Sequence, residues 1–303
     1  MKLLLVRHLW GVDLSGGFSP HISSWHEVGY RALEGWLGMC PDPALLRKTL
    51  ESEGFRWISL VFSSAPFSGG GSVQQHLQFL REQIESSLDL QPLFFNAHTG
   101  SDSWTATEAE DFYGLALELE KKIGVPISHE THRSRYFGNP WHTQTLLLRF
   151  PELKLTCDFS HWVCVAERLL GDCAHIIQRA ASQCFHLHAR VGYEEGPQVS
   201  DPRAPEWKSH LEAHEAWWTE VWNAQLRRGM ETVTLTPEFG PPPYQHTLPY
   251  SQKPVSDLTA ICDWMAVRQV VRFRDLLSAA EVGRRSKRVS AFPTKNRAQS
   301  RGL

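Results

Sequence analysis

Short apolar segments alternate with longer amphipathic segments along most of the chain. The short segments are rich in β-branched and aromatic residues, as buried β-strands are. Eight of them are predicted as strands, at residues 3–6, 32–34, 57–62, 93–96, 126–128, 155–157, 184–187 and 232–236. Strands that alternate with helix-length segments are typical of a parallel sheet made of βα units. Eight such units, which need about 250 residues, predict an α/β fold of the (β/α)₈ TIM-barrel type with outer helices.

Five amphipathic segments are predicted as helices. They span residues 73–87, 107–123, 165–181, 209–228 and 256–280. Thr107 and Glu110 have the spacing of a capping box, and Gly124 with Pro126 is expected to end that helix. The first two units show only a weak helical period. The loop at residues 192–207 is long for a βα connection, and long loops at this face of a barrel tend to be functional.

Composition and charge narrow the class of protein. A chain of 303 residues that is 42% hydrophobic fits one large globular domain. The formal net charge of -2 gives no general field that would attract nucleic acid or an anionic membrane. The six cysteines are scattered without a CxxC pair, which indicates reduced thiols in the core. No segment approaches the roughly 20 apolar residues of a membrane span, and the first residues are too short a run for a signal peptide, so a cytoplasmic location is expected.

The last residues of the chain differ from the rest. From Gly283 onward the sequence is basic and has few apolar residues. We predict a barrel domain at residues 1–282 and a disordered, solvated tail at residues 283–303. A localisation signal or nucleic-acid-binding arm is the alternative for the tail, although nucleic acid is not expected as a partner of the barrel. The sequence leaves the oligomeric state open, homo-oligomers included.

Four of the later apolar segments end in an acidic residue or a histidine. These endings place Glu130, Asp158, the pair His186 and His188, and Glu238 at the carboxyl ends of successive predicted strands. A single carboxylate at a strand end is commonly a helix cap or a solvated charge. Four such endings in succession predict a metal site around the mouth of a parallel barrel.

The order Glu, Asp-x-x-His, His and Glu at these strand ends resembles the xylose isomerase-like TIM barrel superfamily, of the sugar phosphate isomerase/epimerase type. Sugar epimerases, inosose dehydratases, hydroxypyruvate isomerases and the endonuclease IV branch belong to it. Gly-Tyr-Arg-Ala-Leu-Glu at residues 29–34 and Phe-Asn-Ala-His-Thr-Gly at residues 95–100 are similar to its second-strand and fourth-strand signatures. The resemblance extends from Met1 to about Ala280 and implies the same fold.

The resemblance implies that Glu130, Asp158, His186 and Glu238 bind one divalent metal ion, Mn²⁺, Mg²⁺, Co²⁺ or Zn²⁺. Three carboxylates and an imidazole suit these ions, and no thiolate selects for a softer metal. His186 is preferred to His188 because Phe-His-Leu matches the seventh-strand pattern of the superfamily. Strand alternation turns both histidines to the same side, so the other is expected to pack in the barrel or contact the substrate.

The resemblance also implies an enzyme, a metal-dependent isomerase or epimerase of a small sugar or related polyhydroxylated carbonyl compound. Glu130 and Glu238 would remove and return a proton at carbon, with the metal stabilising an enediolate. The alternatives are a sugar dehydratase (a lyase) of the same superfamily, an endonuclease IV-like phosphodiesterase, and a metal- or sugar-binding barrel without turnover. The phosphodiesterase is disfavoured because the loop after the seventh strand lacks the extra Asp-x-His pair of that branch.

Five residues are expected to contact the substrate. His161 falls where the superfamily has a substrate-binding histidine, although a solvated residue at a helix start is the alternative. His98 and Arg190 are candidates for hydroxyl or carboxylate contacts, and His188 is one if it is not a ligand. Trp162 is the best candidate among the tryptophans for a pocket wall, against which the apolar face of a sugar packs.

Other aromatic and acidic residues also follow predicted strands. Four further tryptophans do so and are either pocket walls or core residues: Trp10, Trp36, Trp104 and Trp141. Glu34, at the end of the second strand, is expected either to bond the substrate or to pair with an arginine.

Overall fold

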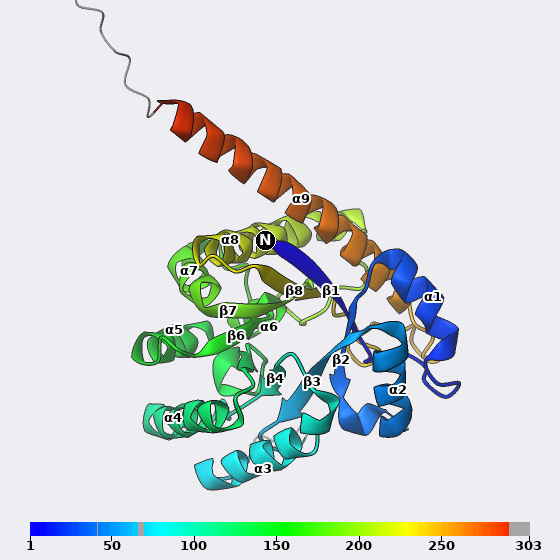
Figure 1. Cartoon of the computed structure of the whole chain (residues 1–303), viewed down its shortest axis with the longest axis vertical. Helices are drawn as coiled ribbons and strands as arrows, with labels where there is room; N and C mark the ends of the chain where they lie inside the picture. The colour runs from blue at the N-terminus through cyan, green and yellow to red at the C-terminus, as the bar shows by residue number, and fades with distance from the viewer. Residues whose placement is uncertain (41, 66–69, 291–303) are drawn as a thin grey trace, which may run out of the picture.

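Eight parallel strands form a closed barrel (Figure 1). The computed structural model describes residues 1–40, 42–65 and 70–290. Each strand pairs with the next along the chain, and the last pairs with the first. The strands are β1 Lys2–His8, β2 Ala32–Trp36, β3 Arg56–Phe62, β4 Phe95–His98, β5 Ile127–Glu130, β6 Lys154–Cys157, β7 Cys184–His188 and β8 Thr232–Thr236. The predicted (β/α)₈ barrel is confirmed.

All eight predicted strands are present, and the differences lie at their ends. β1 continues two residues further than predicted, to His8. β4 lies two residues later, because its Phe95 pairs with Ser59 on β3 and with Ile127 on β5. Such pairing depends on the neighbouring strands and is invisible in the local sequence.

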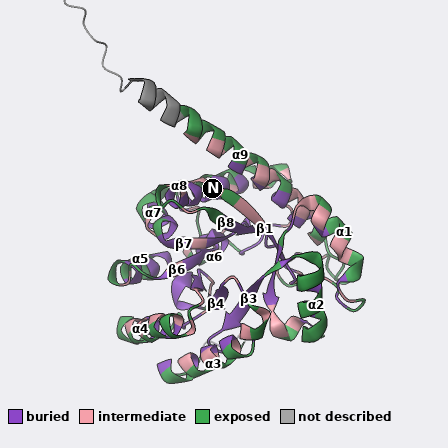
Figure 2. Cartoon of the chain, in the orientation of Figure 1, coloured by how far each residue is buried: buried purple, intermediate pink, exposed green. Residues whose placement is uncertain are grey.

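Helices surround the barrel, with buried residues on the strands and the inner helix faces and exposed residues outside (Figure 2). They are α1 Ser19–Val28, α2 Pro43–Glu53, α3 Val73–Glu85, α4 Ala106–Ile123, α5 Pro140–Arg149, α6 Phe159–Ala166, α7 Ala174–Gln183, α8 Lys208–Arg227 and α9 Leu258–Ser290. The capping box of α4 is formed by Thr105 and Glu108 instead of Thr107 and Glu110, because the helix begins at Ala106. Gly124, with φ 70°, ends α4 as predicted.

The single helix predicted at residues 165–181 is wrong. The side chain of Asp158 accepts a hydrogen bond from the backbone N–H of Ser160, so that α6 begins directly after β6. α6 ends at Ala166, where the next residue, Glu167, takes a left-handed conformation with φ 50°. α7 starts after a short 3₁₀ turn at Gly171–Cys173. The early cap holds Asp158 at the mouth of the barrel.

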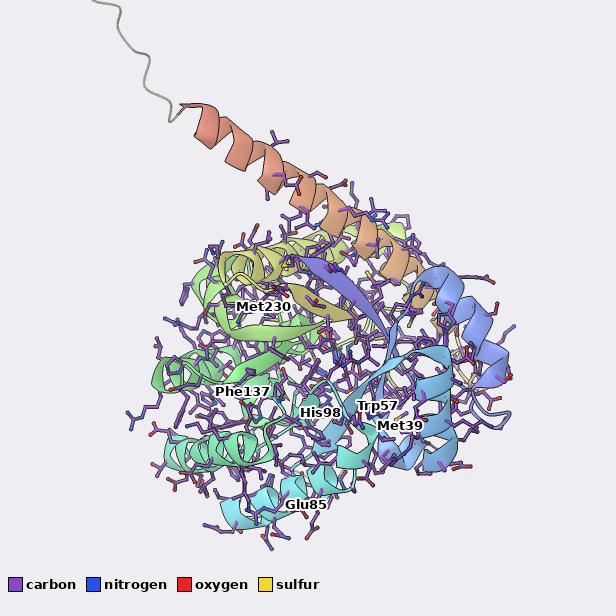
Figure 3. All side chains as sticks on the ribbon, in the orientation of Figure 1. Met39, Trp57, Glu85, His98, Phe137 and Met230 are labelled. Carbon is purple, nitrogen blue, oxygen red and sulfur yellow. The ribbon has the colours of Figure 1, made fainter. Side chains whose placement is uncertain are left out.

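Alternation along the strands arranges side chains in layers inside the barrel. A small buried cluster, separate from the main core, contains Val6, Ala32, Ile58 and Phe94. Side chains two positions further along a strand point the same way. The next layer therefore contains His8, Glu34, Leu60 and Asn96, and it is largely polar. In Figure 3, His98 lies near the centre of the barrel, whereas Glu85 lies on the outer helix α3.

Helix α9 packs on the barrel and then extends beyond it (Figure 1). Glu215 on α8 anchors it, accepting hydrogen bonds from both Arg268 and Gln269. The helix includes the first residues of the segment predicted as a disordered tail, up to Ser290. The rest of that prediction falls on residues 291–303, outside the described residues. Across the described ranges, no helix is long and apolar enough to span a bilayer.

Candidate metal centre

Polar side chains from four consecutive strand ends converge at the mouth of the barrel. Glu130 ends β5, Asp158 follows β6, His188 ends β7 and Glu238 follows β8. Each offers one ligand atom, and these atoms all lie within 4.8 Å of one another. All four residues are buried. We call this group the carboxylate–histidine ring.

His188, and not the predicted His186, belongs to this ring. His186 lies one layer deeper in the barrel, where its Nδ1 is 2.7 Å from Thr234 Oγ1 and its Nε2 is 3.3 Å from Glu34 Oε2. Both histidines point to the same side of β7, as alternation predicts. Depth along the strand separates them, and a sequence pattern does not show depth.

Glu34 fixes the orientation of His188. Its Oε1 lies 3.1 Å from His188 Nε2, and its Oε2 accepts a 2.6 Å hydrogen bond from Thr236. Burial disfavours the charged form, but His188 and His186 outweigh burial and hold the pKa of Glu34 well below its usual value. Glu34 therefore pairs with histidines, instead of the substrate or the arginine expected from sequence. A carboxylate on one nitrogen of a histidine is the usual partner of a metal-binding imidazole.

Three buried atoms of the ring have no hydrogen-bond partner among the described residues. They are Glu130 Oε1, His188 Nδ1 and Glu238 Oε2. Two of them, His188 Nδ1 and Glu238 Oε2, lie 2.8 Å apart as an ion pair. Buried polar atoms are almost always bonded. Three carboxylates, one imidazole and these free donor atoms fit a divalent cation.

The charges within the ring are strongly coupled. Burial raises the pKa of Asp158 to about 6, with Arg190 opposing this shift and Glu238 and Glu130 reinforcing it. Burial acts in the same direction on Glu238, but Arg190 and His188 outweigh it and lower the pKa of Glu238 to about 2. Adjacent carboxylates repel one another, and a cation between them relieves that repulsion.

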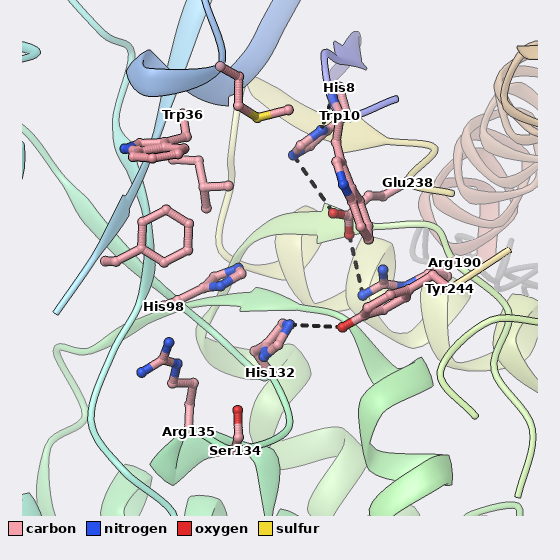
Figure 4. Close-up of a pocket in the computed structure, with 13 residues that line it drawn as sticks. His8, Trp10, Trp36, His98, His132, Ser134, Arg135, Arg190, Glu238 and Tyr244 are labelled. Carbon is pink, nitrogen blue, oxygen red and sulfur yellow. Dashed lines mark hydrogen bonds and ion pairs between the residues drawn. The ribbon is translucent and has the colours of Figure 1, made fainter. Parts of the chain in front are cut away.

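A pocket of about 250 Å³ opens above the ring (Figure 4). Glu238 and Arg190 reach it from the ring side, and His98 reaches it from the end of β4. Its lining is His8, Trp10, Trp36, Met39, Leu60, Phe62, His98, His132, Ser134, Arg135, Arg190, Glu238 and Tyr244. Of the predicted substrate contacts, His98 and Arg190 therefore line the pocket.

His161 and Trp162 do not line the pocket. The indole N–H of Trp162 donates a 2.7 Å hydrogen bond to the Phe137 carbonyl, and the ring is fully buried in the core. His161 lies behind Arg190, whose guanidinium is 2.6 Å from His161 Nε2. Helix α6 begins so early that these side chains face the protein interior. Among the other tryptophans, Trp10 and Trp36 line the pocket, whereas Trp104 and Trp141 do not.

Sequence reasoning missed several residues of the pocket. His8 ends β1 and its Nε2 lies 3.7 Å from Glu238 Oε1. The ending of the first apolar segment in a histidine, as in the later segments, was a signal that could have identified it. Tyr244, in the loop after β8, stacks on Arg190, and its hydroxyl lies 3.4 Å from His132. Nothing in the loop sequence indicates this position.

The same fold occurs in solved sugar epimerases. D-allulose 3-epimerase from Methylomonas sp. aligns with a TM-score of 0.55 and 13% identity over 90% of this chain and 97% of the epimerase. The apo form of 3-keto-D-glucoside 4-epimerase from E. coli aligns with a TM-score of 0.57 and 7% identity over 90% of this chain and 100% of that enzyme.

A xylose isomerase-like TIM barrel protein from Mycobacterium smegmatis, in complex with magnesium, is also similar. It aligns with a TM-score of 0.56 and 13% identity over 91% of this chain and 97% of that protein. No protein-family profile and no curated protein sequence matches the chain. At these identities the likeness establishes the fold alone, so the chain has the (β/α)₈ barrel fold of these proteins.

Proposed function

We propose that the protein is a divalent-metal-dependent isomerase or epimerase of a small polyhydroxylated carbonyl compound. The observation that carries this proposal is the carboxylate–histidine ring, in which three buried atoms beside a pocket make no hydrogen bond among the described residues. Its fold is shared with sugar epimerases of known structure.

Glu130, Asp158, His188 and Glu238 would hold the ion. Asp158 already accepts bonds from Arg190 and Ser160, but a carboxylate has about four lone-pair sites and retains capacity for a ligand. When bound, a divalent ion supplies Lewis acidity that polarises a carbonyl oxygen and makes the neighbouring C–H more acidic.

Glu130 and Glu238 are the proposed acid and base. Glu130 Oε2 accepts 2.9 Å hydrogen bonds from Asn96 and His98, which fix the carboxylate and leave Oε1 without a partner. Glu238 lines the pocket and follows β8, whereas Glu130 ends β5. One glutamate takes a proton from carbon and the other returns it, which epimerises a centre or moves a carbonyl.

Arg190 would bind an oxygen of the substrate. Its Nη2 donates a 2.5 Å hydrogen bond to Asp158 Oδ2 and lies 3.5 Å from Glu238 Oε2, and the side chain also lines the pocket. Its charge stabilises negative charge that develops on the substrate during proton removal.

Exchange of carbon-bound hydrogen with solvent deuterium tests this proposal. The metal-loaded protein is incubated in D₂O with a panel of ketoses that includes D-allulose, and exchange is followed by NMR. The parent should exchange a proton next to the carbonyl, and Glu238→Gln should reduce the rate by about 10²- to 10⁴-fold. Glu194→Gln is the control, because Glu194 lies in the loop after β7 and bonds His210.

Two outcomes would contradict the proposal. One is the absence of exchange with every ketose, and the other is an unchanged rate in Glu238→Gln. Exchange accompanied by loss of water from the product would assign the protein as a dehydratase instead, since that reaction begins with the same proton removal.

A further inference from the structure

One wall of the pocket is apolar. β2 and β3, with the turn after β2, supply Trp36, Met39, Leu60 and Phe62, which we call the apolar wall. Figure 4 shows Trp36 across the pocket from Glu238 and Arg190. The histidines, arginines and glutamate of the described lining come from β1, from β4 and from the loops after β5, β7 and β8.

The register of the strands builds this wall. Trp36 on β2 is paired with Leu60 on β3, so the two side chains are neighbours. Phe62 follows Leu60 by two positions and points the same way. Its ring meets that of Trp36 edge-on with centroids 5.8 Å apart. β3 therefore supplies apolar side chains at the level where other strands supply polar ones.

The side chains of the apolar wall offer almost no hydrogen-bonding partner to a hydroxyl group. Its one side-chain N–H, Trp36 Nε1, donates a 3.0 Å hydrogen bond to Gln83 on α3. A free sugar carries a hydroxyl on nearly every carbon. A hydroxyl turned toward this wall would lose its water without gaining a protein partner, which disfavours binding.

Aromatic rings also lie on the other side of the pocket. Trp10 and Tyr244 meet edge-on with ring centroids 4.9 Å apart, and both line the pocket. The space between these rings and the apolar wall suits a flat apolar group, since such groups pack favourably against aromatic faces and edges.

We propose that the substrate carries a flat apolar group, such as an aromatic ring, attached to its hydroxylated carbonyl part. The carbonyl end lies at the carboxylate–histidine ring, and the apolar group binds against the apolar wall. This inference rests on the proposed function for the carbonyl end, and it narrows the substrate class from free sugars to sugars or hydroxy ketones with an apolar substituent.

Binding of two matched probes tests the inference. 2-Hydroxyacetophenone and hydroxyacetone are both α-hydroxy ketones, and they differ only in a phenyl or a methyl group on the carbonyl. We expect the metal-loaded full chain to bind the phenyl compound about 10- to 100-fold more tightly by calorimetry, as burial of an aromatic ring implies. Equal affinity for the two probes would overturn the inference.

Variants show whether the apolar wall causes the preference. Met39→Gln and Leu60→Asn, which nearly keep side-chain volume and add hydrogen-bonding groups, should each reduce the phenyl preference several-fold. Met39 is half-buried, so its variant tests the wall even if Leu60→Asn does not fold. Leu148→Asn, at a residue on α5 that is 59% exposed, is the matched control and should leave the preference unchanged. A preference that survives both wall variants would contradict the inference.

Probe binding and proton exchange together distinguish a failure of this inference from a failure of the proposed function. A phenyl preference without any proton exchange would support the binding of an apolar group at the apolar wall and contradict the proposed reaction. Proton exchange with free ketoses and no phenyl preference would support the proposed reaction and contradict the binding of an apolar group at the apolar wall.

Discussion

Oε1 of Glu34 lies 3.1 Å from Nε2 of His188, and both side chains are fully buried inside the barrel. The contact joins β2 to β7 and leaves the other nitrogen of His188 facing the carboxylate–histidine ring. Burial opposes protonation of this histidine, but Glu34, Glu238 and Glu130 raise the pKa of His188 well above its usual value. A proton and a cation therefore compete for the same nitrogen.

Glu34→Gln should weaken divalent-ion binding although Glu34 is outside the ring. Loss of the carboxylate removes the group that orients His188 and increases its basicity, and such partners typically change metal affinity by about 10- to 100-fold. Calorimetric titration with Mn²⁺ measures the effect, with circular dichroism as the check on folding. An unchanged affinity in a folded variant would contradict the orienting role.

The two histidines of β7 should differ in their effect on metal binding. His188→Gln removes a ligand atom from the ring, whereas His186→Gln removes a side chain whose partners are Thr234 and Glu34. We expect His188→Gln to lose most of its bound Mn²⁺ and His186→Gln to retain it. The opposite result would restore His186 as the ligand.

Trp162→Phe should reduce stability without affecting ligand binding. The substitution removes the indole N–H that bonds the Phe137 carbonyl and leaves a buried acceptor without its partner. A loss of this kind costs about 1–3 kcal/mol of the free energy of unfolding, which urea denaturation measures. A selective loss of ligand affinity at unchanged stability would instead indicate a pocket role for Trp162.

His214 on α8 should make the fold sensitive to mild acid. Burial lowers the pKa of His214 to about 4, although a hydrogen bond to the His210 carbonyl opposes this shift. Its Nε2 accepts a bond from the Gly192 N–H, so protonation would replace an acceptor with a donor. The unfolded histidine titrates near pH 6.5, so between about pH 6.5 and about pH 4 the unfolded chain binds more protons and stability falls as pH falls.

The stability lost on acidification from above about pH 6.5 to below about pH 4 amounts to about 3 kcal/mol at 1.36 kcal/mol per pKa unit, because the buried His214 resists protonation. His214→Gln should be less stable than the parent at neutral pH, and the difference should shrink in acid. Urea unfolding at about pH 4.5 and about pH 7 measures both differences. An equal difference at the two pH values would contradict this account.

The sequence predicted the barrel because its strongest signal is the alternation of apolar segments and amphipathic helices. That signal does not fix where an element ends. β1 reaches His8 and β4 is displaced because strand pairing in the closed barrel, not local propensity, sets those ends. The break between α6 and α7 was missed because a cap at Asp158 and a left-handed residue at Glu167 determine it.

The sequence also predicted part of the candidate site. The sequence predicted that Glu130, Asp158 and Glu238 lie together because each follows a predicted strand directly, and strand ends meet at one face of a parallel barrel. The sequence did not show that His188, rather than His186, lies beside the three carboxylates, because side chains two positions apart share a face and differ only in depth. Tyr244 was missed because it reaches the pocket from an irregular loop.

Metal content per chain shows whether the carboxylate–histidine ring binds an ion. The parent, Asp158→Asn, Glu238→Gln and the control Glu194→Gln are each incubated with Mn²⁺, passed through a desalting column and analysed by plasma mass spectrometry. We expect about one ion per chain in the parent and in Glu194→Gln, and strongly reduced content in the two ring variants, as removal of ligands implies. No bound ion in the parent, or equal content in all four proteins, would contradict a metal centre at the carboxylate–histidine ring.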